Sequence, residues 1–158
     1  MALLTGNEII EIAVKLEDSG EAFYTAAVEK TADIKIKALF RDLAAQERLH
    51  RRTFQRLIQP RGQAVEFVLA PDQWGEFQAY VDALLRQTLF TDSENALSRA
   101  AEAKDAQEAL LAAIRFEKES LLFFHELKSV VRGDGQRAVA RIIEEERQHI
   151  QRLTEMLT

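Results

Sequence analysis

The chain has 158 residues, of which 47 % are hydrophobic and 30 % are charged, a composition typical of a folded globular protein. Its formal net charge of -5 disfavours nucleic-acid binding, which usually needs a basic face. Because the chain has no cysteine, disulfides, thiolate metal sites and cysteine nucleophiles are excluded. The N-terminus lacks the pattern of a signal peptide, and no apolar stretch approaches the ~20 residues that span a bilayer. We therefore expect a cytoplasmic protein that does not bind membranes.

The first part of the chain predicts two long helices. Glycine and proline are scarce, at 6 and 2 residues, which favours helix over strand. A capping-box pattern at Thr5 begins the first helix, which we expect to end near Lys30. The second helix is predicted from about Ile34 to Gln59. The short joint between the two helices predicts an antiparallel hairpin over about residues 5–59.

Residues 60 to about 104 differ from the segments on either side. Residues 64–69 are compatible with an extended strand, and a short amphipathic helix is predicted from Trp74. A second short helix is expected to follow Ser93, which suits the position of a cap. Since the segment carries no metal-ligand pattern, we interpret it as a long crossover between two pairs of helices.

The last part of the chain predicts a second helical hairpin, over about residues 105–158. Asp105 is the expected N-cap of its first helix. The Gly-Asp-Gly sequence at residues 133–135 is expected to break the chain before the last helix. The chain is thus predicted to be all-α, with residues 1–158 forming a single domain.

Two Glu-x-x-His sequences stand out, one in each predicted hairpin. They pair Glu47 with His50 and Glu146 with His149. Residues three apart lie on the same face of a helix, and both glutamates lie at the middle of an apolar stripe. A buried glutamate is rare unless it is paired, so these two residues indicate metal ligands.

The partner helix of each hairpin supplies one further glutamate. Glu117 is central on its stripe, whereas Glu17 lies roughly 60° from the centre of its stripe for a turn of ~100° per residue. Glu21 is the alternative to Glu17 as a metal ligand, but it points further from the apolar stripe. His125 is expected to be a surface residue, or a residue that contacts a ligand, rather than a metal ligand itself. Tyr24 either forms a hydrogen bond near the expected metal ligands, where it would support catalysis, or packs as an ordinary aromatic residue of the core.

The two halves of the chain resemble each other. Residues 16–24 align with residues 116–124 at an offset of 100, and residues 46–50 align with residues 145–149 at an offset of 99. Such a repeat is one structural unit used twice, so the four stripes are expected to meet around a pseudo-two-fold axis.

Four carboxylates in a dry core cannot all remain ionised, because burial and mutual repulsion favour their protonated forms. Two divalent cations would balance their charge, while the histidines would add neutral nitrogen ligands. Such a donor set suits iron or manganese, and zinc is a substitute in vitro. We therefore predict two iron ions per site, with open positions for O2 or hydrogen peroxide.

The chain resembles the rubrerythrin-type branch of the ferritin-like superfamily. The resemblance rests on Glu17 with Tyr24 seven residues later, and on the motifs at residues 46–50, 116–120 and 145–149. It covers most of the chain outside the crossover. It implies a ferritin-like antiparallel four-helix bundle, built from two helical hairpins joined by a long crossover with short helices.

The resemblance also implies the ligands and the assembly. Glu47 and Glu146 would bridge the two metals, and the protein would be a homodimer, with helical pairs exchanged between subunits in some relatives. The complete set of implied ligands is Glu17, Glu47, His50, Glu117, Glu146 and His149.

Two features depart from the rubrerythrins that reduce peroxide. The absence of cysteine means that there is no rubredoxin domain, so an electron donor would be a separate protein or a small molecule. Ser120 stands where those enzymes carry an extra glutamate. The expected function is that of a diiron oxidoreductase that oxidises Fe(II) with O2 or peroxide, or that reduces peroxide. The alternatives are an iron-binding or storage module and a non-catalytic helical interaction domain.

Overall fold

The structure is a computed structural model that describes residues 4–58, 60 and 66–158. Within these residues it contains six α-helices and no β-strand. A single 3-10 turn follows the first helix, and Phe67 forms an isolated antiparallel bridge with Val131. The elements are α1 (Gly6–Ala27), η1 (Val28–Lys30), α2 (Ile34–Leu57), α3 (Trp74–Gln87), α4 (Ser93–Glu102), α5 (Ala106–Val130) and α6 (Gly133–Glu155).

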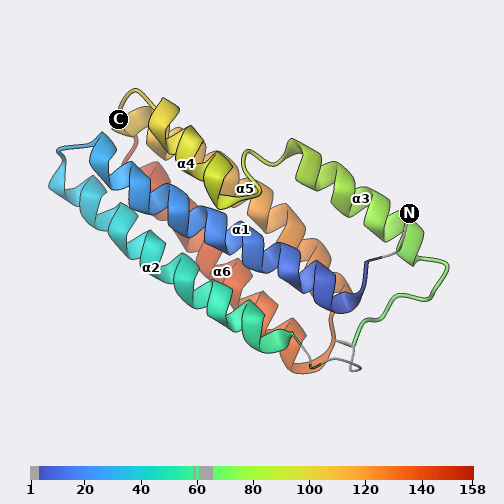
Figure 1. Cartoon of the computed structure of the whole chain (residues 1–158). Helices are drawn as coiled ribbons and strands as arrows, with labels where there is room; N and C mark the ends of the chain where they lie inside the picture. The colour runs from blue at the N-terminus through green and yellow to red at the C-terminus, as the bar shows by residue number, and fades with distance from the viewer. Residues whose placement is uncertain (1–3, 59, 61–65) are drawn as a thin grey trace.

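The four long helices form a bundle (Figure 1). Helices α1 and α2 pack as one antiparallel hairpin, and α5 and α6 pack as a second. The hairpins meet where α1 contacts α5 and where α2 contacts α6. The predicted all-α, ferritin-like bundle of two hairpins is therefore confirmed.

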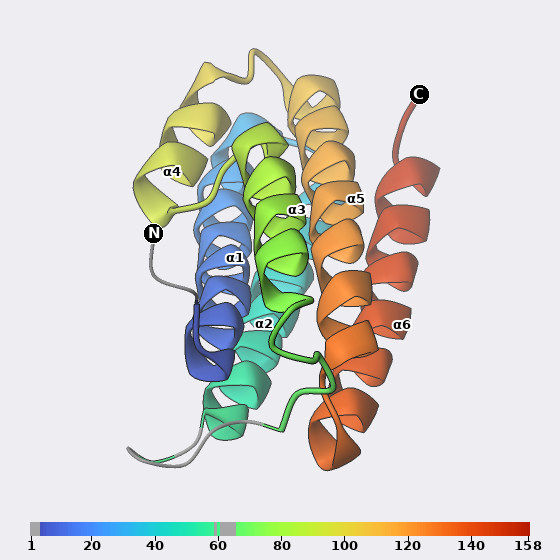
Figure 2. The same cartoon turned by 90° about the vertical axis from the view of Figure 1, so that its right-hand side faces the viewer.

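The crossover runs along the outside of this bundle (Figure 2). Helix α4 packs against α1, and α3 packs against α5, so the chain returns to the end of the bundle where α5 begins. Phe90 fixes the joint between the two short helices, because its ring stacks on Phe23 at 5.2 Å and on Phe116 at 4.0 Å. As a result, α1 is covered by three helices: α2, α4 and α5.

Polar caps set the start of several helices. Thr5 and Glu8 form the predicted capping box of α1. Asp33 caps α2, and Asp105 caps α5 as expected. The cap of α4 is Asp92 rather than the predicted Ser93, because the Asp92 carboxylate accepts the Asn95 backbone N–H and Ser93 is already helical.

Two predicted helix boundaries need correction. Helix α2 ends at Leu57 rather than Gln59, because Ile58 adopts extended backbone two residues before Pro60, which cannot continue a helix. The predicted break over residues 133–135 lies earlier, at Val131 and Arg132, which cap the two helices. All three residues from 133 to 135 belong to α6, and Gly133 begins that helix with φ of 61°, a conformation that favours glycine.

Part of the extended segment predicted over residues 64–69 lies outside the described residues, namely Ala64 and Val65. In the described part, the Val68 N–H donates to the Val130 carbonyl, which ties the segment to the end of α5. No helix in the described ranges combines the length and apolar character needed to cross a membrane.

Candidate metal centre

Six side chains from the four long helices meet inside the bundle, and none is more than 3 % exposed. Helices α1 and α5 each contribute one glutamate, while α2 and α6 each contribute a glutamate and a histidine. The six residues are Glu17, Glu47, His50, Glu117, Glu146 and His149. The structure therefore brings together all the residues that the sequence predicts as ligands.

Their donor atoms form two overlapping groups. One group takes Glu17 and His50, the other takes Glu117 and His149, and both include Glu47 and Glu146. Within each group the donor atoms lie within 4.8 Å of one another. Two neighbouring ions could therefore share two carboxylates, as the resemblance to rubrerythrins implies for Glu47 and Glu146.

Several polar atoms of this cluster find no hydrogen-bond partner outside the cluster among the described residues. They include both oxygens of Glu17 and of Glu146, and Nδ1 of both His50 and His149. Each unsatisfied buried polar atom costs about 1–3 kcal/mol, so an isolated cluster of this kind is unfavourable. Unshared lone pairs that converge from four helices fit a cation.

The carboxylates interact strongly with one another. Burial raises the pKa of Glu17 and of Glu47, and repulsion from Glu146 raises both further. Burial likewise raises the pKa of Glu117 to about 8. Burial also opposes ionisation of Glu146, but the adjacent His149 outweighs it and holds the pKa of Glu146 below its usual range.

The histidines supply positive charge to these carboxylates. Burial lowers the pKa of His50, yet Glu17 and Glu146 overcome this effect and raise it to about 12. In the same way, Glu117 and Glu146 raise the pKa of His149 despite its burial. The Nδ1 atom of each ring lies 2.8 Å from an oxygen of Glu146. Metal binding would replace protons at these nitrogens.

The outer nitrogen of each histidine has its own partner, which sequence reasoning did not single out. His50 Nε2 lies 2.7 Å from the carboxylate of Glu145, and His149 Nε2 lies 2.9 Å from the amide oxygen of Gln46. Glu145 and Gln46 occupy equivalent positions in the repeat, directly before the bridging glutamates. That equivalence was the available signal in the sequence.

Tyr24 takes part in the centre rather than only in the core. Its hydroxyl donates a hydrogen bond to Glu117 Oε1. Burial, followed by the charge of Glu117, raises the pKa of Tyr24 well above its usual value, so the hydroxyl stays neutral and remains a donor. Of the two alternatives for Tyr24, the structure favours the hydrogen bond near the centre.

Gly20 makes room for one of the shared carboxylates. A Cβ atom at this position would lie 2.4 Å from Glu47 Oε2 and 3.1 Å from Glu47 Cδ. Glycine lowers helix stability by up to about 1 kcal/mol relative to alanine, so its presence within α1 has a packing reason. The sequence places Gly20 on the apolar stripe but does not reveal this contact.

Other candidates from the sequence lie outside the centre. The carboxylate of Glu21 pairs with Arg48 at 2.7 Å and with Arg51 at 2.6 Å, so it belongs to a surface network. His125 is exposed, as expected for a residue that is not a ligand. Ser120 is buried, and its hydroxyl has no hydrogen-bond partner among the described residues.

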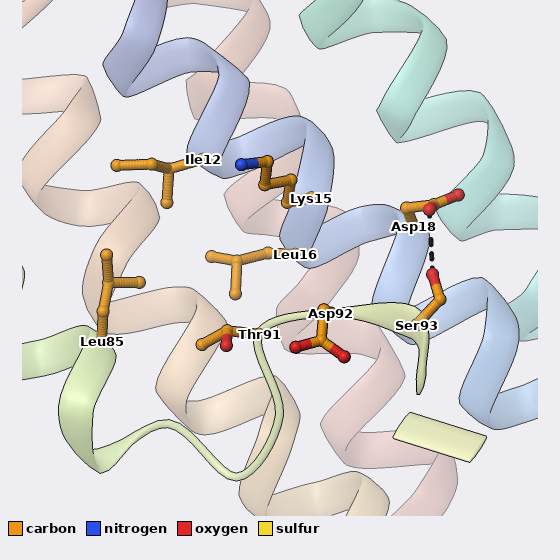
Figure 3. A pocket seen from close by; sticks show the side chains of 8 residues that line it. All are labelled: Ile12, Lys15, Leu16, Asp18, Leu85, Thr91, Asp92 and Ser93. Atoms are coloured by element: carbon orange, nitrogen blue, oxygen red, sulfur yellow. Dashed lines mark hydrogen bonds between the residues drawn. The ribbon is translucent and has the colours of Figure 1, made fainter. Parts of the chain in front are cut away.

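Several cavities lie at the bundle, and two of them bear on the position of the site. The larger has about 430 Å³ and contains none of the six clustered residues. Figure 3 shows Ile12 and Leu85 on one side of it, and on the other side the hydrogen bond from Ser93 to Asp18, 2.9 Å long. The smaller cavity, of about 200 Å³, lies between α2 and α6 and reaches His50 and Glu145. Of these two cavities, the one on the α2–α6 side is therefore the one that reaches a residue of the centre.

The comparisons with known proteins agree with this geometry. A rubrerythrin family profile matches residues 8–106, a range that includes Glu17, Glu47 and His50. A crystal structure from Thermotoga maritima, described as that of a candidate ferritin-like diiron-carboxylate protein, has a TM-score of 0.66 and 27 % identity. That similarity covers 99 % of this chain and 96 % of the other. No curated protein sequence matches. Because the family match spans more than half of the sequence, the chain belongs to the rubrerythrin family.

Proposed function

We propose that the chain binds two iron ions in this centre and uses O2 or hydrogen peroxide to oxidise Fe(II), or reduces peroxide with electrons from an external donor. The observation that carries the proposal is the pair of donor groups that share Glu47 and Glu146. Two bound Fe(II) ions would supply the two electrons that, with two protons, convert one hydrogen peroxide molecule to two waters.

The donor set fits iron in number, type and charge. Four carboxylates and two imidazoles provide hard oxygen and intermediate nitrogen ligands, which suit iron or manganese. The charge of two divalent ions would cancel that of four carboxylates. It would also satisfy the buried oxygens and Nδ1 atoms that find no hydrogen-bond partner outside the cluster among the described residues.

The surrounding residues hold this donor set in place. The Tyr24 hydroxyl fixes Glu117 and keeps its proton beside that carboxylate. Glu145 and Gln46 orient the two imidazoles so that Nδ1 of each ring faces the centre. A hydrogen-bond partner on the ring nitrogen that does not bind the metal sets the tautomer and the orientation of a metal-binding histidine.

Stopped-flow absorbance of the anaerobically Fe(II)-loaded protein tests the proposal. The protein is mixed with O2 or with hydrogen peroxide, and the oxidised iron is followed over time. We expect oxidation faster than that of Fe(II) in buffer, and no such acceleration in Glu146→Gln. Oxidation by the wild-type protein that is no faster than in buffer would show that the redox function is wrong.

A further inference from the structure

The two ends of the centre are related by the internal repeat, but their surroundings differ. We call the end with Glu17 and His50 the first position, and the end with Glu117 and His149 the second position. Each has one glutamate and one histidine of its own and shares the two bridging carboxylates. A symmetric pair of positions would bind two ions equally, so any difference must come from the neighbouring residues.

The first difference lies behind the histidines. His50 faces the carboxylate of Glu145, whose side chain is 40 % exposed and forms no ion pair with arginine or lysine among the described residues. His149 faces the neutral amide of Gln46. The Gln46 amide nitrogen donates to Asp42 at 2.7 Å, which fixes its oxygen toward the ring. A carboxylate behind an imidazole increases its basicity as a ligand more than a neutral amide does.

The second difference lies at the glutamates. The carboxylate of Glu117 shares one oxygen with the Tyr24 hydroxyl, which reduces the charge available to an ion. The residue equivalent to Tyr24 in the second half is Phe124, which has no hydroxyl and packs on Phe54 at 5.2 Å. Glu17 has no hydroxyl donor of this kind among the described residues, and its nearest recognised partner, His50 Nδ1, lies 3.5 Å from Oε2. Glu17 therefore offers a cation more negative charge than Glu117 does.

The third difference is access. The cavity of about 200 Å³ between α2 and α6 is lined by His50 and Glu145 and includes no residue of the second position. Arg141 lines the same cavity as Glu145, so the charge of its wall is mixed, but among the described residues the cavity reaches the first position and not the second.

We propose that the two metal positions are inequivalent, and that the first position, with Glu17 and His50, binds its ion more tightly and fills first. Glu145 is the positioning residue that acts through His50, and Gln46 is its weaker counterpart behind His149. This inference rests on the proposed dinuclear centre. It adds which position is loaded first and which residues outside the ligand set decide it.

The three histidines of the chain allow a direct test. The full-length protein, labelled with ¹⁵N at histidine and freed of metal with a chelator, is titrated with Zn(II) as a diamagnetic probe. Long-range ¹H–¹⁵N spectra then report each Nδ1 atom. We expect His50 to shift during the first equivalent and His149 only during the second, while the exposed His125 stays unchanged as an internal reference.

Variants of Glu145 and Gln46 test whether these two residues cause the difference in affinity between the positions. Glu145→Gln gives both histidines an amide partner and should weaken the tighter step about 10–100-fold, so that the difference in affinity between the two steps narrows. Gln46→Glu should strengthen the weaker step. Glu144→Gln is the matched control, because exposed Glu144 pairs with Arg147 at 3.1 Å and does not touch His50. Both binding steps should stay unchanged in that control.

The outcomes distinguish this inference from the proposed function. Simultaneous shifts of His50 and His149, or a shift of His149 first, overturn the inference but leave a dinuclear centre. So does an unchanged tighter step in Glu145→Gln, provided that its circular dichroism spectrum is native. If neither histidine shifts, and anaerobic Fe(II) also fails to bind, the proposed metal centre is itself wrong and the inference falls with it.

Discussion

Single side chains decide whether the interior of the bundle can hold ions. Glu146 is the most connected residue of the metal centre. Its two oxygens each lie 2.8 Å from a histidine Nδ1, and it belongs to both donor groups. A neutral amide of the same shape would keep the packing but remove a bridging charge. The substitution should therefore affect metal binding, and it should also remove two contacts with histidines from the metal-free protein.

Glu146→Gln should abolish the binding of two ions while the protein stays folded. The ionised Glu146 contacts Nδ1 of both histidines, and His149 holds its pKa below the usual range, so we expect the metal-free variant to unfold at a lower temperature than the metal-free wild type. Metal analysis after anaerobic Fe(II) loading and a thermal melt measure the two effects. Glu144→Gln, on the exposed side of the same helix, should retain full iron content.

Gly20→Ala tests whether the missing side chain is needed for the metal or for the fold. The added methyl group would approach Glu47 Oε2 to 2.4 Å and displace that carboxylate. Alanine also favours a helix by up to about 1 kcal/mol, so the stability of the metal-free protein should change little. Metal affinity, measured by titration calorimetry, should fall at least tenfold. Gly75→Ala, with nothing within 4 Å, is the control and should bind metal normally.

The residues at the middle of apolar stripes were predictable from the sequence, and those that support them were not. Glu47, Glu117 and Glu146 are recognisable because a glutamate is rare at such positions. The contact of Gly20 with Glu47 depends on how closely two helices approach, and that distance is not encoded in either helix alone. Glu17 is more deeply buried than its place beside the stripe suggested, since three helices cover α1.

At the level of elements, the crossover is held to the bundle by residues with no part in the metal centre. Glu119 of α5 accepts the Leu89 N–H with one oxygen and pairs with Arg115 at 2.8 Å with the other. Glu119 therefore contacts the crossover rather than the metal centre. It ties the joint between α3 and α4 to the second hairpin.

Glu119→Ala should loosen this attachment without loss of iron. The Leu89 N–H would lose its partner, and we expect the free energy of unfolding to fall by roughly 1–3 kcal/mol. Denaturant unfolding and metal analysis of the same preparation test this. Glu11→Ala, at an exposed position on α1, should leave both quantities unchanged. Loss of iron from Glu119→Ala would mean that the crossover shapes the centre.

Helix identity was easier to predict from the sequence than the path of the connecting segment. The long helices follow from their apolar periodicity and caps, and their boundaries differ by only a few residues where Gly133 and Pro60 act locally. The sequence identified the crossover and its two short helices. Its docking depends on contacts such as those of Phe90 with Phe23 and Phe116, which join distant parts of the chain.

For the whole molecule, metal binding and protonation compete for the same atoms. Without metal, the native state keeps a proton on His50, whose pKa is raised to about 12, and on Glu117, whose pKa is raised to about 8. In the unfolded chain these groups have their ordinary pKa values, 6.5 for the histidine and 4.5 for the glutamate, and they release their protons above those values. The native state therefore binds more protons than the unfolded state through the neutral range, and its stability falls as the pH rises.

The metal-free protein should thus be less stable at pH 8.5 than at pH 6.5, by about 1 kcal/mol per pH unit for each extra proton. Bound metal replaces these protons, so the metal-loaded protein should lose less stability over the same range. Thermal melts of both forms at the two pH values measure the difference. A gap between the two melting temperatures that shrinks as the pH rises would contradict this prediction.

The pseudo-two-fold arrangement of the molecule was visible in the sequence, whereas its asymmetry was not. The repeat predicted which helices pair and that four glutamates would meet. Tyr24 against Phe124, and Gln46 against Glu145, are differences that any alignment of the halves displays. Only the fold shows that each lies beside a residue of the centre and that both favour the same metal position.

The iron content of the protein tests the central claim most directly. The metal-free chain is loaded anaerobically with Fe(II), separated from unbound iron, and analysed for iron and protein by mass spectrometry, alongside Glu146→Gln. Two ions per chain in the wild type, and fewer than one in the variant, are the predicted results. Fewer than one ion per chain in the folded wild type would contradict a dinuclear centre.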